Sequence, residues 1–182
     1  PAAAYQMMAF TNLKQEGLVV LATHRVAGGI EGFAPQTFLQ KLQGRFDIVE
    51  FRFTPQDEDK AQTRQKMLAE MKSLHEKDRV AFGIYMAGDA FHIAILKDKQ
   101  LMASVAPDRS EAWRTLDVSV LQKLVLEELL GIDEERMGDP DYVEYVKDVP
   151  NAIGEIIARI DTAQKQVRSE EHTSELQSRQ SI

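Results

Sequence analysis

The sequence contains no cysteine among its 182 residues. Disulfide bonds, thiolate catalysis and cysteine-ligated zinc sites are therefore excluded, and a chain without thiols suits the reducing cytoplasm. Long apolar runs are also missing, because no stretch approaches the roughly 20 residues that a membrane-spanning helix needs. The first residues show no basic region followed by an apolar one, so no signal peptide is indicated. We therefore expect a cytoplasmic protein without a membrane partner.

Basic residues are scarce. The chain has 22 Lys and Arg against 29 Asp and Glu, which gives a formal net charge of -7. A nucleic-acid partner is disfavoured, because neutralising phosphates needs clustered Lys and Arg. With 43% hydrophobic and 28% charged residues, the composition is ordinary for a globular protein. A small-molecule ligand is kept as a possible partner, which the composition neither indicates nor excludes.

The last residues form a separate segment. Residues 168–178 read Arg-Ser-Glu-Glu-His-Thr-Ser-Glu-Leu-Gln-Ser, which resembles the in-frame translation of a ligation adapter used in short-read sequencing. The alternative is a natural polar tail. We expect residues 168–182 to be non-natural and disordered, and such a segment is set aside before fold reasoning. The chain also begins at Pro1 without Met, so we expect residues 1–167 to be a partial α/β domain, truncated at both ends.

Residues 54–59 form a strong helix start. Thr54 can cap the helix, Pro55 suits the first helical position, and the three carboxylates at 57–59 favour the positive end of the helix dipole. The helix is predicted to run to about Glu76 with one buried stripe. The stripe consists of Ala61, Leu68, Met71 and Leu74.

The other patterns alternate between strands and helices. Residues 5–13 and 18–22 are predicted as a hairpin across the polar turn 14–17, with the end of a helix as the alternative for residues 5–13. A second hairpin turns at Ala87-Gly88-Asp89. Asp117 is expected to cap a helix, and Gly44 and Gly131 are typical helix stops. These alternations indicate an α/β or α+β fold with a mixed β-sheet and flanking helices. The remaining strands are expected at 46–53, 80–86, 90–96 and 142–146, and the remaining helices at 35–43, 118–130 and 150–163.

Thr23-His24-Arg25 is the best candidate site in the sequence. It follows an apolar run and is predicted to lie where a strand ends, a common place for ligand groups in α/β sheets. His24 could act as the catalytic acid or base, while Thr23 and Arg25 could bind phosphate or substrate. Gly28 and Gly29 would allow close approach of the backbone to an anion. The alternative is a strand end with a solvated His and Arg, followed by a flexible turn.

Other polar groups have simpler explanations. Residues 57–59 could be a metal cluster, but such a run more often marks the start of a helix. His92 fits a strand histidine, and His75 fits a helix C-terminus. Asp108 and Arg109 could be polar site groups, or could belong to an ordinary turn before the helix that contains Trp113. The histidine spacings show no metal-ligand pattern, so no metal site is predicted.

Several segments together resemble one uncharacterised bacterial family, the domain-of-unknown-function family numbered 1015. Residues 18–25, Leu-Val-Val-Leu-Ala-Thr-His-Arg, are similar to a family strand that ends in Pro-Thr-His-Arg, with Ala22 in place of the usual Pro. Residues 82–98 resemble its central hairpin. Residues 116–132 resemble its helix that begins with Leu-Asp and ends with Leu-Leu-Gly, and residues 145–148 resemble the following strand end.

The resemblance implies missing parts and a class of activity. Family members carry an upstream Asp-Gly-His-His-Arg motif, in a region that resembles the ParB-like fold, and a downstream Met-Pro-Pro-Lys-Ser-Thr-type motif. Neither motif occurs in this chain. Since ParB-like proteins include free-serine kinases, the resemblance implies a nucleotide- or phosphate-handling enzyme, a phosphotransferase using ATP or ADP with Mg²⁺. The alternative is a non-catalytic regulatory module that binds a metabolite or a protein.

Overall fold

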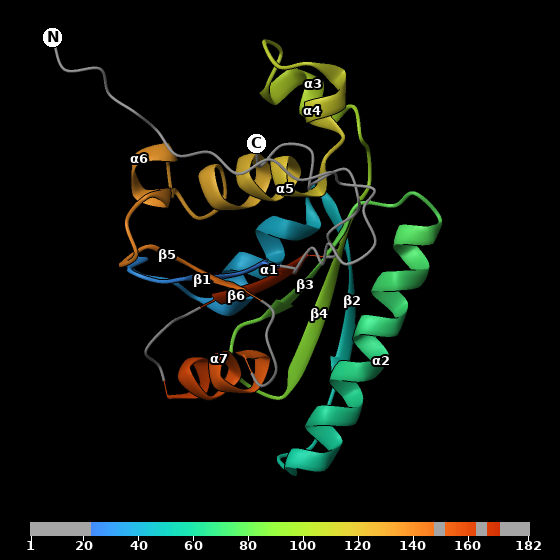
Figure 1. Cartoon of the computed structure of the whole chain (residues 1–182), viewed down its shortest axis with the longest axis vertical. Coiled ribbons are helices and arrows are strands. Elements are labelled where there is room, and N and C mark those ends of the chain that lie inside the picture. The colour runs from blue at the N-terminus through green and yellow to red at the C-terminus, as the bar shows by residue number, and fades with distance from the viewer. Residues whose placement is uncertain (1–22, 148–151, 163–166, 172–182) are drawn as a thin grey trace, which may run out of the picture.

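The computed structural model describes residues 23–147, 152–162 and 167–171 (Figure 1). Six strands form one sheet in the order β2-β4-β3-β6-β1-β5, and its described strand pairs are antiparallel. The expected mixture of helices and sheet is confirmed, in its α+β form. The strands are β1 (Thr23–Ala27), β2 (Phe46–Arg52), β3 (Ala81–Tyr85), β4 (Ala90–Leu96), β5 (Val143–Lys147) and β6 (Val167–Glu171).

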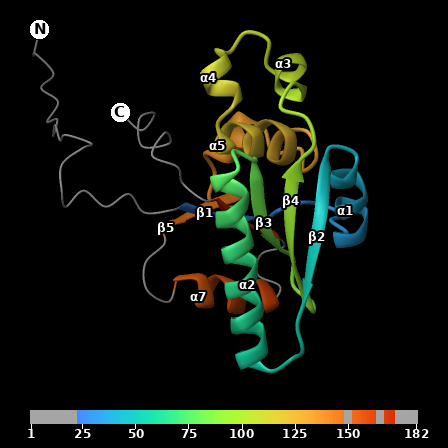
Figure 2. The ribbon, with the colours of Figure 1, turned by 90° about the vertical axis from the view of Figure 1, so that its right-hand side faces the viewer.

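Helices cover both faces of this sheet. The long helix α2 and the helix α7 lie on one face, and α1 lies on the other (Figure 2). The helices are α1 (Pro35–Gln43), α2 (Asp57–Glu76), α3 (Leu101–Val105), α4 (Glu111–Arg114), α5 (Asp117–Val120), the π-helical segment η1 (Leu121–Glu127), α6 (Glu134–Met137) and α7 (Ala152–Asp161).

The face covered by α1 holds the larger apolar cluster, which we call the α1-side core. Phe82 of β3 and Leu96 of β4 pack there with Phe38 of α1 and Leu124 of η1, and all four are buried. Full burial of each such side chain contributes roughly 1.5–3 kcal/mol. This cluster therefore fixes α1 and η1 against the sheet.

The opposite face holds the α2-side core. Tyr85 of β3 and Phe91 of β4 belong to one buried cluster with Met71 of α2 and Ile156 of α7. The rings of Tyr85 and Phe91 lie 5.0 Å apart, within the range of favourable aromatic pairs. This packing brings α2 and α7, which are far apart in the sequence, together over the same strands.

Several predicted elements are confirmed. Helix α1 spans residues 35–43 as expected, with Pro35 in its first turn and Gly44 after its last residue. Strand β2 and the hairpin of β3 and β4 also fall within the predicted ranges, and β5 begins and ends one residue later than predicted. Helix α7 lies inside the predicted range 150–163, whose residues 150, 151 and 163 are outside the described residues.

Helix α2 begins later than the sequence indicated. Thr54 does not cap it directly; its backbone N–H and its hydroxyl both donate to a carboxylate oxygen of Asp59, at 2.6 and 2.8 Å. These bonds hold the chain before the helix and lower the pKa of Asp59. The buried stripe contains Met71 and Leu74 as expected, while Ala61 is exposed. Thr63 and Met67 are the other buried residues of the helix.

The helix predicted for residues 118–130 is divided. A short α-helix passes into η1 at Leu121, and Leu116 rather than Asp117 stands at its N-cap. The wider turn is visible in the hydrogen bond from the backbone N–H of Leu130 to the carbonyl of Val125, at 3.0 Å. Gly131 ends the segment with φ +68°, as a helix-stop glycine does. The short helices α3 and α6 were not predicted.

The expectation for the tail is wrong in one part. Residues 168–171, expected to be disordered, belong to β6 between β1 and β3. Pairing through backbone N–H and carbonyl groups explains this, since open strand edges accept a segment whatever its side chains are. The rest of the tail and the hairpin predicted for residues 5–22 lie outside the described residues.

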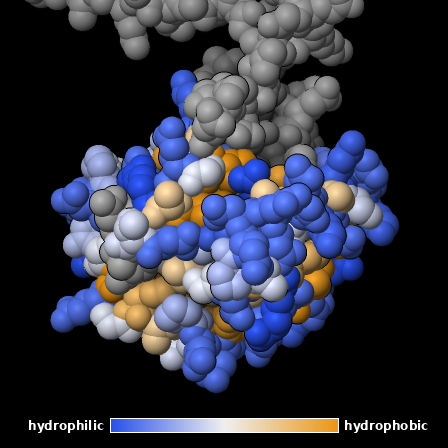
Figure 3. Space-filling model, turned by 90° about the horizontal axis from the view of Figure 1, so that it is seen from below, coloured by the Kyte–Doolittle hydropathy of each residue, from blue (hydrophilic) through white to orange (hydrophobic). Residues whose placement is uncertain are grey.

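The face of the molecule that Figure 3 shows is mostly polar. Seen from below, hydrophilic side chains surround smaller apolar patches (Figure 3). Among the described residues, the large hydrophobic side chains that are exposed are Val49 on β2 and Tyr145 on β5, the two edge strands of the sheet. No helix in the described part of the chain is long and apolar enough to cross a membrane.

Candidate functional site

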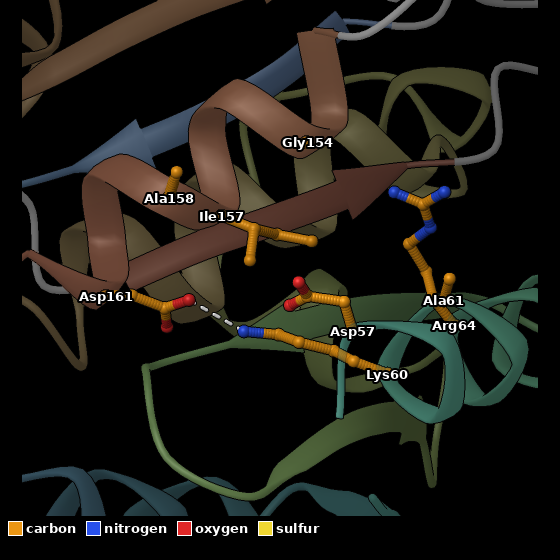
Figure 4. Close-up of a pocket in the computed structure, with 8 residues that line it drawn as sticks. All are labelled: Asp57, Lys60, Ala61, Arg64, Gly154, Ile157, Ala158 and Asp161. Atoms are coloured by element: carbon orange, nitrogen blue, oxygen red, sulfur yellow. Dashed lines mark hydrogen bonds and ion pairs between the residues drawn. The ribbon is translucent and has the colours of Figure 1, made fainter. Parts of the chain in front are cut away.

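A cavity of about 250 Å³ lies between the first two turns of α2 and helix α7 (Figure 4). Four charged side chains border it, two cationic and two anionic. Figure 4 shows the Lys60 and Asp57 side chains extending toward α7, while the Arg64 guanidinium lies apart from them. The cavity is lined by Asp57, Lys60, Ala61 and Arg64 from α2, and by Gly154, Ile157, Ala158 and Asp161 from α7.

Lys60 is the best-connected of these side chains. Its ammonium donates to the Tyr85 hydroxyl at 2.8 Å and to Asp161 Oδ2 at 2.7 Å. It also lies over the rings of Tyr85 and Phe53, at 4.7 and 5.2 Å from their centroids. With its side chain only 18% exposed, Lys60 is held by a carboxylate, a hydroxyl and two aromatic faces at once.

Tyr85 connects this cluster to the core. Its ring is 2% exposed, and its hydroxyl donates to Asp161 Oδ1 in a short hydrogen bond. Burial, followed by the hydrogen bond to Asp161 and the negative charge of that carboxylate, raises the pKa of Tyr85. The phenol therefore stays protonated over a wide pH range and remains a donor to Asp161.

We expect this shift to appear as a loss of stability at alkaline pH. Above about pH 10 the unfolded tyrosine ionises while folded Tyr85 does not, so the stability that Tyr85 contributes is lost as pH rises toward its folded pKa. The slope for one fully shifted group is about 1.4 kcal/mol per pH unit. Urea unfolding measures the free energy of unfolding of wild type and Tyr85→Phe between pH 8 and about pH 11. This free energy should fall more steeply with pH in wild type than in Tyr85→Phe. Parallel curves would contradict the assignment.

Arg64 has no such set of partners. Its Nε is buried and has no hydrogen-bond partner among the described residues. Arg64 lies one turn after Lys60 on the same face of α2, but the two side chains point in different directions (Figure 4). An arginine donor buried without an acceptor is costly, which makes it a natural place for an anionic ligand oxygen.

The residues predicted at Thr23-His24-Arg25 are not gathered at one place. The strand does not end there, because β1 continues through Val26 and Ala27, which are buried and pair with β5. His24 is 3% exposed and shares the α2-side face with Val26. Arg25 therefore points to the opposite face, where its guanidinium lies 5.3 Å from the centre of the Tyr145 ring.

The glycines that follow β1 make close backbone contacts. The N–H of Gly28 donates to the carbonyl of Tyr142 at 2.8 Å. Gly29 has φ +65°, and a Cβ at this residue would lie 3.2 Å from the carbonyl oxygen of Asp141. Thr23, at the start of the strand, pairs with Lys147. The glycines thus serve the packing of the loop before β5, and their role in phosphate binding stays a prediction.

The other polar candidates lie apart from one another. His92 in β4 is 8% exposed, and burial lowers its pKa, against the opposing effect of Glu50. Arg109 lies 5.2 Å from the centre of the Trp113 ring, which lies in α4 as expected. Asp57, Glu58 and Asp59 open α2. Among the described residues, no group of three or more His, Cys, Asp or Glu is placed to hold a metal ion.

The sequence reasoning missed the residues around the cavity. Lys60 and Arg64 have the spacing of neighbours on a helix face, but that spacing is also typical of a solvated surface. No pattern in the sequence around Asp161 indicates a site, because Asp161 meets Lys60 and Tyr85 only when α7 packs beside α2. Tyr85 was read only as part of a strand.

Comparison with known proteins decides the family. Residues 1–119 match the family model described as Protein of unknown function (DUF1015). The chain belongs to this family. No curated protein and no solved structure matches it. The part of the chain that matches DUF1015 includes Lys60, Arg64 and Tyr85, while the side of the cavity formed by α7 lies outside the matched residues.

Proposed function

We propose that this DUF1015 chain binds the phosphate group of a small metabolite in the cavity between α2 and α7, with Arg64 as the main contact. The observation that carries the proposal is the buried Nε of Arg64, which has no partner among the described residues and lines the cavity. A guanidinium offers several donors in a planar fork that matches the geometry of phosphate oxygens. Lys60, one turn earlier, supplies a second cation.

The size of the cavity restricts the ligand. At about 250 Å³ it is smaller than the range of about 300–1,000 Å³ that is usual for whole-ligand sites. It suits a phosphate group with a few attached atoms. If the ligand is a nucleotide, its base and sugar would lie outside the cavity.

The carboxylates of Asp57 and Asp161 also affect which ligand the cavity can bind. Asp161 already pairs with Lys60, so the positive charge of Lys60 is largely balanced before a ligand arrives. Arg64 is then the stronger anion contact. Asp57 and Asp161 can accept hydrogen bonds from hydroxyl or amino groups beside the phosphate. The arrangement favours a phosphorylated metabolite that carries donors over a bare anion.

Phosphotransfer is the second candidate function of this chain. It follows from the Thr23-His24-Arg25 segment and from the resemblance to ParB-like proteins, with ATP or ADP and Mg²⁺ as the implied cofactors. A catalytic base must come within hydrogen-bonding reach of the proton that it removes. Because His24 is 3% exposed in β1, we favour ligand binding without catalysis by His24.

Thermal unfolding with and without ligand tests the binding proposal. The probes are inorganic phosphate, phosphoserine, and ADP or ATP with Mg²⁺. A ligand at about 100 times its Kd that binds only the folded state should raise the Tm of a chain of this size by about 5–10 °C. Arg64→Gln should abolish most of this shift, because the phosphate loses its guanidinium.

Lys72→Gln is the matched control. It removes one positive charge from the same helix at an exposed residue that does not line the cavity. Lys72→Gln should show the same ligand-induced rise in Tm as wild type. Equal shifts in wild type, Arg64→Gln and Lys72→Gln would show a general ionic effect and rule out the proposed site. Phosphate transfer from ATP that disappears in His24→Ala would restore the enzymatic hypothesis.

A further inference from the structure

The face of the sheet that α1 covers (Figure 2) holds a second cavity. Its volume is about 350 Å³, and three segments of the chain surround it. These are residues 30–34, which precede α1, the helix α1 itself, and residues 128–131, which follow η1. We call it the α1 cavity. It shares no lining residue with the cavity between α2 and α7, which belongs to the other face of the sheet.

Apolar side chains line much of the α1 cavity. Phe38 of α1 is 2% exposed, and its ring lies 5.8 Å from that of Phe33, which precedes the helix. Ile30, Leu129 and Leu130 also line the cavity and pack, partly buried, against the α1-side core. Such side chains keep some contact with water until an apolar group covers them. The cavity therefore favours a ligand that has an apolar part.

Two charged side chains of the α1 cavity are open to a ligand. Lys41 of α1 and Glu31 of the preceding loop both line the cavity and are exposed. Within the described part of the chain, neither makes an ion pair or a side-chain hydrogen bond, with the other or with a third residue. Glu128 also lines the cavity, but its carboxylate pairs with Arg45. Among the described residues, the cavity thus offers one positive and one negative charge that are not already paired.

Charge complementarity then selects the ligand. A ligand with one charge would satisfy either Lys41 or Glu31 and meet the like charge of the other. A zwitterion satisfies both, and the volume of about 350 Å³ lies within the range of about 300–1,000 Å³ that is usual for whole small-molecule ligands. We propose that the α1 cavity binds a free α-amino acid with an apolar side chain, such as leucine or phenylalanine.

Each part of the amino acid has its own contact in this arrangement. Its ammonium donates to the Glu31 carboxylate, and its carboxylate accepts from the Lys41 ammonium. Its side chain lies against Phe33 and Leu129, which line the cavity. Serine lacks the apolar side chain, so it should bind at least about tenfold more weakly than leucine.

Calorimetric titration of the whole chain tests the proposal with ligands that differ in one part each. L-leucine carries the ammonium, the carboxylate and the apolar group. Isocaproate lacks only the ammonium, isoamylamine lacks only the carboxylate, and L-serine lacks the apolar group. We expect each missing charge to weaken binding about tenfold relative to L-leucine. Binding of isocaproate or isoamylamine as tight as that of L-leucine would overturn the proposal.

Lys41→Gln and Glu31→Gln test the two charged contacts separately. Each removes one charge from an exposed residue, so the fold should be retained. We expect each variant to raise the Kd for L-leucine about tenfold. Lys41→Gln should also lose the difference between L-leucine and isoamylamine, because the carboxylate no longer has its partner. Glu31→Gln should lose the difference between L-leucine and isocaproate for the matching reason.

Lys72→Gln and Arg64→Gln are the controls. Lys72 is exposed on α2 and lines neither cavity, while Arg64 lines only the cavity between α2 and α7. Both variants should bind L-leucine as wild type does, which keeps this result independent of the proposed phosphate site. Equal Kd values in wild type, Lys41→Gln and Glu31→Gln would overturn the assignment to the α1 cavity. If neither L-leucine nor L-phenylalanine binds, the proposal is wrong, and the cavity is left to an apolar side chain of a partner protein.

Discussion

Phe91→Ala is expected to lower the free energy of unfolding by about 3–5 kcal/mol, the largest single effect that we anticipate. Phe91 is 1% exposed at the centre of the α2-side core. Its ring lies 4.8 Å from that of Phe53 and 5.0 Å from that of Tyr85. The substitution removes apolar contacts, leaves a cavity and weakens two aromatic pairs at once. Urea unfolding followed by circular dichroism measures the loss.

Val49→Ala is the control for this core substitution. Val49 lies on the edge strand β2 and is 38% exposed. Its truncation should change stability by about 0.5 kcal/mol or less. If Phe91→Ala cost no more than Val49→Ala, α2 and α7 could not be packed on the strands as described.

Asp161→Ala should have the second-largest effect, a loss of about 1–3 kcal/mol. The carboxylate accepts from the Lys60 ammonium and from the Tyr85 hydroxyl. Its removal leaves a poorly exposed cation and a buried hydroxyl without their shared acceptor. Because the Asp161 side chain is 40% exposed, water can replace part of these bonds, and we expect the lower half of that range. Chemical unfolding at neutral pH measures the change.

Two further variants separate the pairing from the helix itself. Asp161→Asn keeps an acceptor and loses the charge, so its effect should be intermediate. Glu155→Ala removes an exposed carboxylate from the same helix and should have little effect. A loss in Glu155→Ala as large as that in Asp161→Ala would assign the effect to the net charge of α7, and the cluster around Lys60 would lose its role.

Several helices and turns could be predicted from the sequence, because single residues near their ends determine where they begin and end. Pro35 and Gly44 bound α1 by their own backbone preferences. The turn Ala87-Gly88-Asp89 fixes the hairpin of β3 and β4, where Ala87 and Gly88 both adopt positive φ. The late start of α2 was not predictable in the same way, since it depends on a side chain, Asp59, that reaches back to Thr54.

The candidate site depends on contacts between distant parts of the chain. Lys60 and Asp161 are 101 residues apart and meet only because α2 and α7 cover the same strands. No periodicity within either helix indicates that meeting. His24 illustrates the reverse case. Its residue type and neighbours suggested a reactive strand end, while the continuation of β1 and the packing of the α2-side core leave it buried.

The most direct test of phosphate binding observes Arg64 itself. In a ¹H–¹⁵N spectrum the arginine Nε–H groups give separate signals, and the signal missing from Arg64→Gln belongs to Arg64. On titration with phosphoserine or inorganic phosphate, we expect that signal to move downfield and to saturate, while the other arginine signals stay in place, because its buried Nε gains an acceptor. A stationary Arg64 signal at saturating ligand would contradict the proposed site.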